Sequence, residues 1–132
     1  MILDPSAVVA VAVGEPGCER IVQTILAAQH PGMGAPSAVE LAIVLDTRFP
    51  GRGEAVARAL LDRLGVTVLP FPAHLWPAAH AAYTRFGRGR HPARLNFGDC
   101  LSYAVAKAAG LPLLCVGADF PQTDLELVLL PA

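Results

Sequence analysis

Apolar residues along the chain alternate between short continuous runs and longer stretches with helical spacing. The short runs have the length of strands and fall at residues 1–3, 33–35, 66–71, 111–117 and 125–130. Between them, apolar residues recur three or four positions apart, which is typical of one face of a helix. These stretches are residues 5–13, 18–29, 38–49, 54–65, 73–87 and 97–109. The alternation predicts an α/β fold with a small, mostly parallel sheet flanked by helices on both faces.

Residues at the borders of the helical stretches support this division. Pro5 suits the first position of a helix, where its missing N–H has no partner to lose. Ser37 is expected to cap the stretch that follows it, and Pro77 is expected to disturb the helix around it. Asn96 suits the position before the last helix, and Gly110 suits its end.

The composition limits the classes of protein to which the chain can belong. It has 132 residues, 54% of them hydrophobic, and a mean hydropathy of +0.49. The longest apolar run, residues 7–14, is far shorter than the ~20 residues that span a bilayer. The start lacks a basic secretory leader, so we expect one cytoplasmic domain over residues 1–132, with no membrane segment. The surplus apolar surface is expected to pack against a partner or a second copy.

The cysteines and histidines offer no framework for a metal or for disulfides. There are three cysteines and four histidines, with no C-x-x-C pair and no histidine spacing suited to a zinc site. These residues are interpreted as structural.

Charge is distributed unevenly, although the net charge is only −1. No Asp or Glu occurs from Arg63 to Gly98, and four arginines crowd into RFGRGRHPAR. These are Arg85, Arg88, Arg90 and Arg94. Such a cluster is either a solvated loop or a strip that binds phosphates, for which guanidinium groups are suited.

Four acidic residues occupy places that meet at one edge of a parallel sheet. Asp4 and Asp119 each follow a predicted strand, whereas Glu40 and Asp99 lie early in predicted helices. Ligands of such sheets bind outside the carboxyl ends of the strands. The four acids are therefore candidates for a shared site.

Each acid also has a structural explanation. Asp4 can cap the helix after it, and Asp119 can stabilise a turn. Asp99 can form a capping box with Asn96 at the start of its helix. Glu40 is harder to explain, because its neighbours one turn on are Ile43 and Val44, unless it reaches solvent at the helix edge.

A shared site of carboxylates would require a cation, because like charges in one pocket repel each other. Ligand sets made only of oxygen favour Mg²⁺ or Mn²⁺ over zinc or copper. Together with an arginine strip, this arrangement indicates metal-assisted hydrolysis of a phosphodiester.

Three segments resemble the PIN-domain ribonucleases, specifically the VapC-type toxins of toxin–antitoxin pairs. They are MILDPSAVVAVAVGEP, SAVELAIVL and HPARLNFGDCLSYAVAKAAGLPLLCVGADF. The resemblance implies a dimeric endoribonuclease that depends on Mg²⁺ or Mn²⁺, cleaves tRNA, rRNA or mRNA, and is silenced by a VapB-type antitoxin. It assigns the metal to Asp4, Glu40 and Asp99, and a supporting role to the Ser6 hydroxyl beside Asp4.

Two positions depart from the family pattern. Pro5 stands where a Thr is more usual, and Gly117 or Ala118 stands where many relatives have the fourth acid. Asp119 is then a shifted candidate for that acid. Two alternatives stay open on the sequence: a PIN-like protein-binding module with a decayed site, and a phospho-acceptor or phosphatase domain with a nucleophilic Asp.

Overall fold

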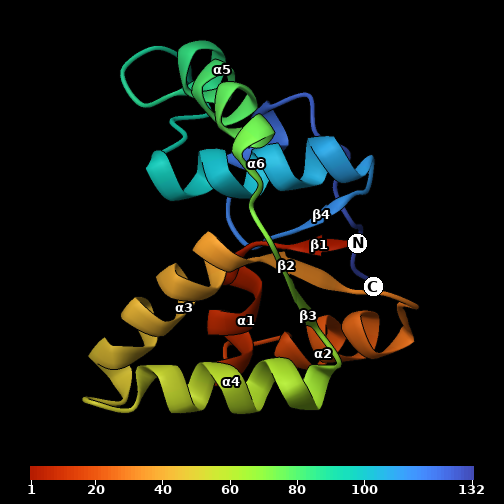
Figure 1. Ribbon diagram of the computed structural model, residues 1–132. Helices are drawn as coiled ribbons and strands as arrows, with labels where there is room; N and C mark the ends of the chain where they lie inside the picture. Colours follow the sequence, from red (N-terminus) through yellow and green to blue (C-terminus); the bar gives the residue numbers. More distant parts are fainter.

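The computed structural model describes residues 1–132 and forms a single α/β domain around a four-stranded parallel sheet. The strands are β1 (Ile2–Leu3), β2 (Gly32–Gly34), β3 (Thr67–Leu69) and β4 (Leu113–Leu114). Their order is β3-β2-β1-β4, so β1 and β2 are neighbours at the centre (Figure 1). The expected mostly parallel sheet is confirmed.

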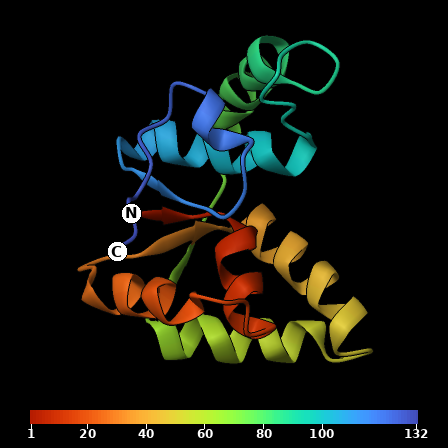
Figure 2. The ribbon, with the colours of Figure 1, turned by 180° about the vertical axis from the view of Figure 1, so that it is seen from behind.

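Six α-helices and two short 3₁₀ turns complete the fold. The helices are α1 (Pro5–Ala12), α2 (Cys18–Ala27), α3 (Ala35–Arg48), α4 (Gly53–Leu64), α5 (Trp76–Phe86) and α6 (Phe97–Ala109). The 3₁₀ turns are η1 (Ala73–Leu75) and η2 (Phe120–Gln122). Helices α5 and α6 lie on one side of the sheet, and α1 to α4 lie on the other (Figures 1 and 2). None of these helices is long and apolar enough to cross a bilayer.

The core is split into two halves by the sheet, because alternate strand residues point to opposite faces. Ile2 and Leu113 are buried with α5 and α6, whereas Leu3 and Leu114 are buried with α1 to α4. Both faces are therefore covered, as the nearly continuous apolar strands predict.

Helix borders follow the expected chemistry at most positions. Pro5 occupies the first turn of α1, and Gly110 ends α6 in the left-handed conformation. The helical stretch expected at 73–87 divides beside Pro77 into the 3₁₀ turn η1 and helix α5, and Pro77 lies in the first turn of α5, where its missing N–H is tolerated. The expected cap at Ser37 is wrong, because α3 begins directly after β2 and Ser37 is buried inside the helix.

A second correction concerns the C-terminal segment. Residues 125–130 do not form a strand; only Leu127 makes an isolated parallel bridge, to Leu113. Two backbone hydrogen bonds hold this segment beside β4. The Leu113 N–H donates to the Glu126 carbonyl, and the Val128 N–H donates to the Leu113 carbonyl.

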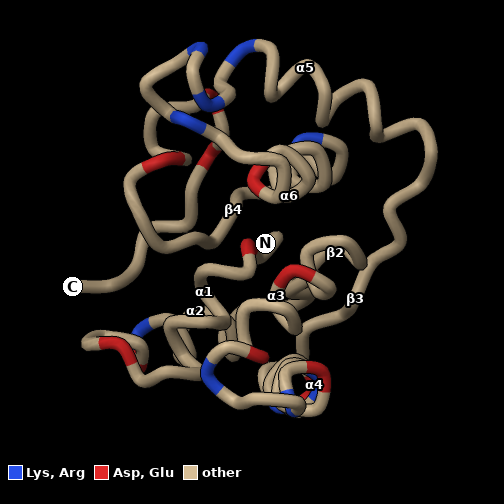
Figure 3. Tube along the Cα trace, turned by 90° about the vertical axis from the view of Figure 1, so that its left-hand side faces the viewer, with Lys and Arg blue, Asp and Glu red and all other residues tan.

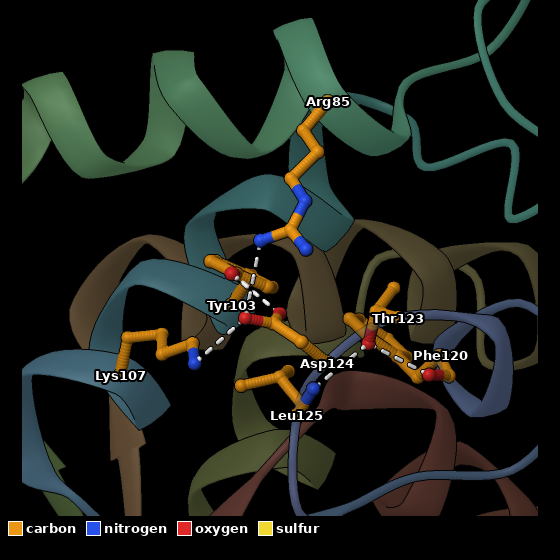
Figure 4. Close-up of polar contacts among 7 residues, drawn as sticks. All are labelled: Arg85, Tyr103, Lys107, Phe120, Thr123, Asp124 and Leu125. Carbon is orange, nitrogen blue, oxygen red and sulfur yellow. Dashed lines mark hydrogen bonds and ion pairs between the residues drawn. The ribbon is translucent and has the colours of Figure 1, made fainter.

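Asp124 anchors the same segment to the α5–α6 layer (Figure 4). It accepts a hydrogen bond of 2.7 Å from the Tyr103 hydroxyl, and it pairs with Lys107 at 2.9 Å and Arg85 at 3.4 Å. Desolvation alone would raise the pKa of Asp124, but the bonds from Tyr103 and Lys107 lower it below its ordinary value. The carboxylate therefore stays charged and serves as a structural clamp.

Candidate active site

Asp4 is placed by the end of β1 and the start of α1. Its amide donates to the carbonyl of Leu114 on β4, so the residue still belongs to the sheet edge. Its Oδ2 accepts the amide N–H of Ser6 at 3.0 Å, which is the capping bond predicted for it. The side chain is only 4% exposed, so this buried carboxylate needs every partner that the fold supplies.

Ser6 supports the site differently from the expectation. The contact with Asp4 comes from the Ser6 amide, whereas the Ser6 hydroxyl accepts the N–H of Val116 at 3.0 Å. This hydroxyl ties the chain beyond β4 to the start of α1, which keeps the carboxyl ends of β1 and β4 together.

Asp99 lies in the first turn of α6, where the predicted capping box is present. The Asn96 side chain accepts the Asp99 amide at 2.8 Å, and Asp99 Oδ2 accepts the Asn96 amide at 3.0 Å. Burial raises the pKa of Asp99 to about 6, and the nearby charges of Asp4 and Asp119 act in the same direction; the bond from Asn96 partly opposes them.

Glu40 approaches the site from α3, the helix that begins directly after β2. Burial raises the pKa of Glu40, and the charges of Asp4 and Asp99 raise it further. The Glu40 carboxylate also lies directly against Gly98 in the first turn of α6. The apolar neighbours that made Glu40 unusual in the sequence are not core residues, since Ile43 is 62% exposed.

Asp4, Glu40 and Asp99 therefore meet at the end of the two central strands. Figure 3 shows that red acidic segments of the chain occur in the middle of the view, between α6 and α3, as well as on the loops and helices farther out. The three ion pairs of the protein involve none of these acids. Neighbouring carboxylates that are buried or half-buried and have no basic partner are a donor set that fits a hard divalent cation.

The acids suit a divalent cation by the chemistry of their oxygen atoms, but their side chains are not already arranged around a metal position. As the side chains stand, no group of three His, Cys, Asp or Glu residues is arranged to hold a metal ion. Asp4 is fixed by its hydrogen bonds with Ser6 and Ser102, whereas the Glu40 side chain makes none and is placed by its contact with Gly98.

Cys115 directly after β4 and Asp119 farther along the chain both lie near the group of acids. Asp119 is exposed and makes no capping bond in η2, and its charge reaches Asp99. Burial raises the pKa of the Cys115 thiol to about 12, with further contributions from Asp4 and Asp99. Cys115 is therefore a neutral neighbour of the acids.

A buried serine, Ser102, also supports Asp4 and was missed in the sequence. Ser102 on α6 donates to Asp4 Oδ1 at 2.7 Å, and the Ser37 hydroxyl of α3 lies 3.3 Å from that of Ser102. They are 1% and 3% exposed. Ser102 follows Asp99 by three positions, one helical turn, and this spacing was the available signal.

The Ser102→Ala variant is expected to weaken Mn²⁺ binding and RNA cleavage by about 10- to 100-fold, the usual effect of losing a residue that orients a ligand. The reason is that Asp4 Oδ1 would lose its only side-chain donor. Mn²⁺ titration calorimetry and single-turnover cleavage measure the two effects.

Ser37→Ala is the matched control, because it removes an equally buried hydroxyl that does not touch Asp4. Equal losses of metal affinity in the two variants would contradict a role for Ser102 in positioning Asp4.

The four clustered arginines, Arg85 in the last turn of α5 and three in the loop after it, are all exposed, but they are not equally free. Arg85 pairs with Asp124 and lies 4.6 Å from the centre of the Phe86 ring. Arg90 lies 5.7 Å from the centre of the Tyr83 ring. Arg88 and Arg94 make no side-chain hydrogen bond or ion pair with other residues, so they are the freest candidates for phosphate contacts.

Comparison with known proteins places this geometry in a family. The PIN domain model matches residues 1–126. The chain is 46% identical over 127 residues to Ribonuclease VapC36 of Mycobacterium tuberculosis, covering 96% of this chain and 91% of the relative. It is 41% identical over 131 residues to Ribonuclease VapC30 of the same species, covering 99% and 100%.

Solved structures show the same fold. The crystal structure of Mycobacterium tuberculosis VapC20, a Sarcin-Ricin loop cleaving toxin, matches with a TM-score of 0.77 at 20% identity, covering 98% of both chains. That of FitAcB from Neisseria gonorrhoeae matches with a TM-score of 0.62 at 19% identity, covering 96% of both chains. The chain therefore belongs to the PIN-domain family, among its VapC ribonucleases. The resemblance stated from the sequence is confirmed.

Proposed function

We propose that the protein is a Mg²⁺- or Mn²⁺-dependent endoribonuclease, the toxin of a toxin–antitoxin pair that acts on cytoplasmic RNA. The observation that supports this proposal is that the charge of Asp4 raises the pKa of both Glu40 and Asp99, while none of the three acids has a basic partner. Family membership among the VapC ribonucleases supports RNA as the substrate.

The roles of the residues follow from their positions. Asp4, Glu40 and Asp99 would hold the cation, and Asp119 is the candidate for completing the site. A divalent cation bound there would activate a water and stabilise the charge that develops on the phosphate. Asn96 and Ser102 orient Asp99 and Asp4, while the exposed arginines attract the RNA backbone.

Cleavage by this chemistry leaves a 5′-phosphate and a 3′-hydroxyl. The partners that we propose are a VapB-type antitoxin, which blocks the site, and a second copy of the chain in a homodimer. Exposed apolar residues on α3, such as Val39 and Ile43, offer surface for such partners. A phospho-acceptor reaction is disfavoured, since no Lys lies near Asp4 and Lys107, the single Lys, is paired with Asp124.

The test is cleavage of a mixture of structured RNAs by the purified protein. We expect cleavage with Mn²⁺ or Mg²⁺, loss of cleavage in EDTA, recovery when excess Mn²⁺ is added, and 5′-phosphate ends. Cleavage that persists in EDTA and leaves cyclic phosphate ends would refute a metal-dependent mechanism.

A further inference from the structure

A hollow of about 740 Å³ lies between α5 and α6, outside the group of acids. Most of its walls are apolar or aromatic, and its ring-bearing side chains are Phe71, Trp76, His80, Tyr83 and Phe97. Phe97 is 79% exposed and Trp76 is 65% exposed. Two large aromatic residues that remain mostly exposed beside one hollow are typical of a binding surface.

The hollow is continuous with the candidate active site through the first turn of α6. Asn96 lines the hollow and forms the capping box with Asp99. Phe97 and Cys100, on either side of Asp99 along the helix, also line it. A ligand in the hollow would therefore sit beside the first turn that carries the acid.

The charged side chains that line the hollow or lie over its rings are basic. Arg88 forms part of the lining, and Arg90 lies over the Tyr83 ring, which is another part of it. No acid occurs between Arg63 and Gly98, the stretch that supplies most of the wall. Asn96 and His80 add hydrogen-bonding groups among the rings.

We propose that this hollow holds an unpaired nucleobase of the RNA substrate, in a nucleotide next to the bond that is cut. The proposal rests on the proposed function and names the part of the substrate that this subsite reads. Unpaired bases are recognised by stacking on aromatic and guanidinium planes and by hydrogen bonds to their edges. Trp76, Phe97 and Arg88 supply the planes, and Asn96 supplies the hydrogen bonds.

A nucleobase fits these observations better than a protein segment. An apolar helix would cover the rings but would leave Arg88 and Asn96 facing an apolar surface without partners. A nucleotide suits the rings, Asn96 and Arg88 at once. Its flat base stacks on the rings, the polar edge of the base bonds to Asn96, and its anionic phosphate pairs with Arg88. The volume is also in the range of small-molecule sites.

The single tryptophan of the chain makes the proposal directly measurable. A short unpaired oligoribonucleotide is titrated into the protein in EDTA, where binding is separated from cleavage, and Trp76 emission is followed. We expect quenching that saturates, and no such quenching by an abasic oligomer of the same length and charge. Phe97→Ala, which keeps the reporter, is expected to weaken binding at least about 5-fold.

The control variant is Leu129→Ala, which removes another exposed apolar side chain, 89% exposed, outside the hollow. It is expected to bind as the unaltered protein does. Equal quenching by the abasic oligomer, or unchanged binding by Phe97→Ala, would overturn the proposal. Trp76 emission that shifts with protein concentration and is unaffected by the oligomer would show a second copy in the hollow, and would also overturn it.

The result can be separated from the test of the nuclease itself. Cleavage in Mn²⁺ without base-dependent quenching would remove the subsite and leave the proposed function intact. Base-dependent quenching without cleavage would show that the hollow binds a nucleobase, and would remove the nuclease and with it the position of that base next to a cut bond.

Discussion

The Asp99→Asn variant is expected to cut RNA at least about 100-fold more slowly than the unaltered protein, because losing even a residue that orients a metal ligand costs 10- to 100-fold. The amide keeps an oxygen for the Asn96 N–H but lacks the negative charge that would attract a divalent cation. Single-turnover cleavage and Mn²⁺ titration measure the two losses. RNA binding in EDTA should be retained, since the arginines are untouched.

Asp62→Asn is the matched control, because Asp62 is an exposed acid on α4 outside the group of acids. It changes the net charge equally and should leave cleavage unchanged. Similar losses in both variants would show that net charge, and not a cation site, is being measured.

The Asp99→Asn substitution is also expected to change how the stability of the metal-free protein depends on pH. The folded-state pKa of Asp99 is raised to about 6, so the folded state binds the proton more tightly than the unfolded state. The contribution of Asp99 to stability therefore increases as the pH falls from above 6 towards 4, and it is lost as the pH rises through 6. In EDTA, the Asp99→Asn variant should show a smaller gain in melting temperature between pH 7 and pH 5 than the unaltered protein.

The positions of the acids could be predicted from the sequence because they depend on local rules. A residue that follows a parallel strand lies at the carboxyl edge of the sheet, and this places Asp4. The capping box at Asn96 and Asp99 is a spacing of three residues that any helix start imposes. Both predictions need only the chain within a few residues of the acid.

The predictions that were wrong depended on contacts between distant segments. The run at 125–130 has the composition of a strand, yet only Leu127 reaches a ladder partner, because Asp124 and the turn before it fix how the segment meets β4. Ser37 suits a helix cap, but β2 runs directly into α3 and leaves no loop to cap. Its hydroxyl instead meets Ser102, a residue 65 positions away.

The aromatic hollow escaped prediction for the same reason. Trp76 and Phe97 lie 21 positions apart on two helices, and neither local sequence shows that the two side chains border one space. The absence of acids from Arg63 to Gly98 can be seen in the sequence. Only the packing of α5 on α6 shows that this stretch supplies most of the wall of one hollow. The distribution of charged residues can be read from the sequence, whereas a cavity lined by two distant segments can be recognised only in the structure.

The second large effect is expected at Gly98, where the sequence suggested no function. A Cβ atom there would overlap Glu40 Oε1 and lie 2.8 Å from Glu40 Cδ. The overlapped atoms are at the end of a flexible side chain, so the Gly98→Ala variant should fold and the Glu40 carboxylate should move. We expect an unchanged or slightly raised free energy of unfolding, since Ala is favoured over Gly in helices by up to about 1 kcal/mol.

Cleavage by the Gly98→Ala variant should nevertheless fall by about 10- to 100-fold, because a displaced carboxylate no longer serves the site. A double-mutant cycle with Glu40→Ala separates this cause from a general disturbance of α6. Once Glu40 is truncated, the extra methyl group meets no carboxylate, so Gly98→Ala should cost nothing more in the Glu40→Ala background. Additive losses in the double variant would mean that the methyl group acts through the helix and the neighbouring Asp99. Full activity in the Gly98→Ala single variant would remove Glu40 from the cation site.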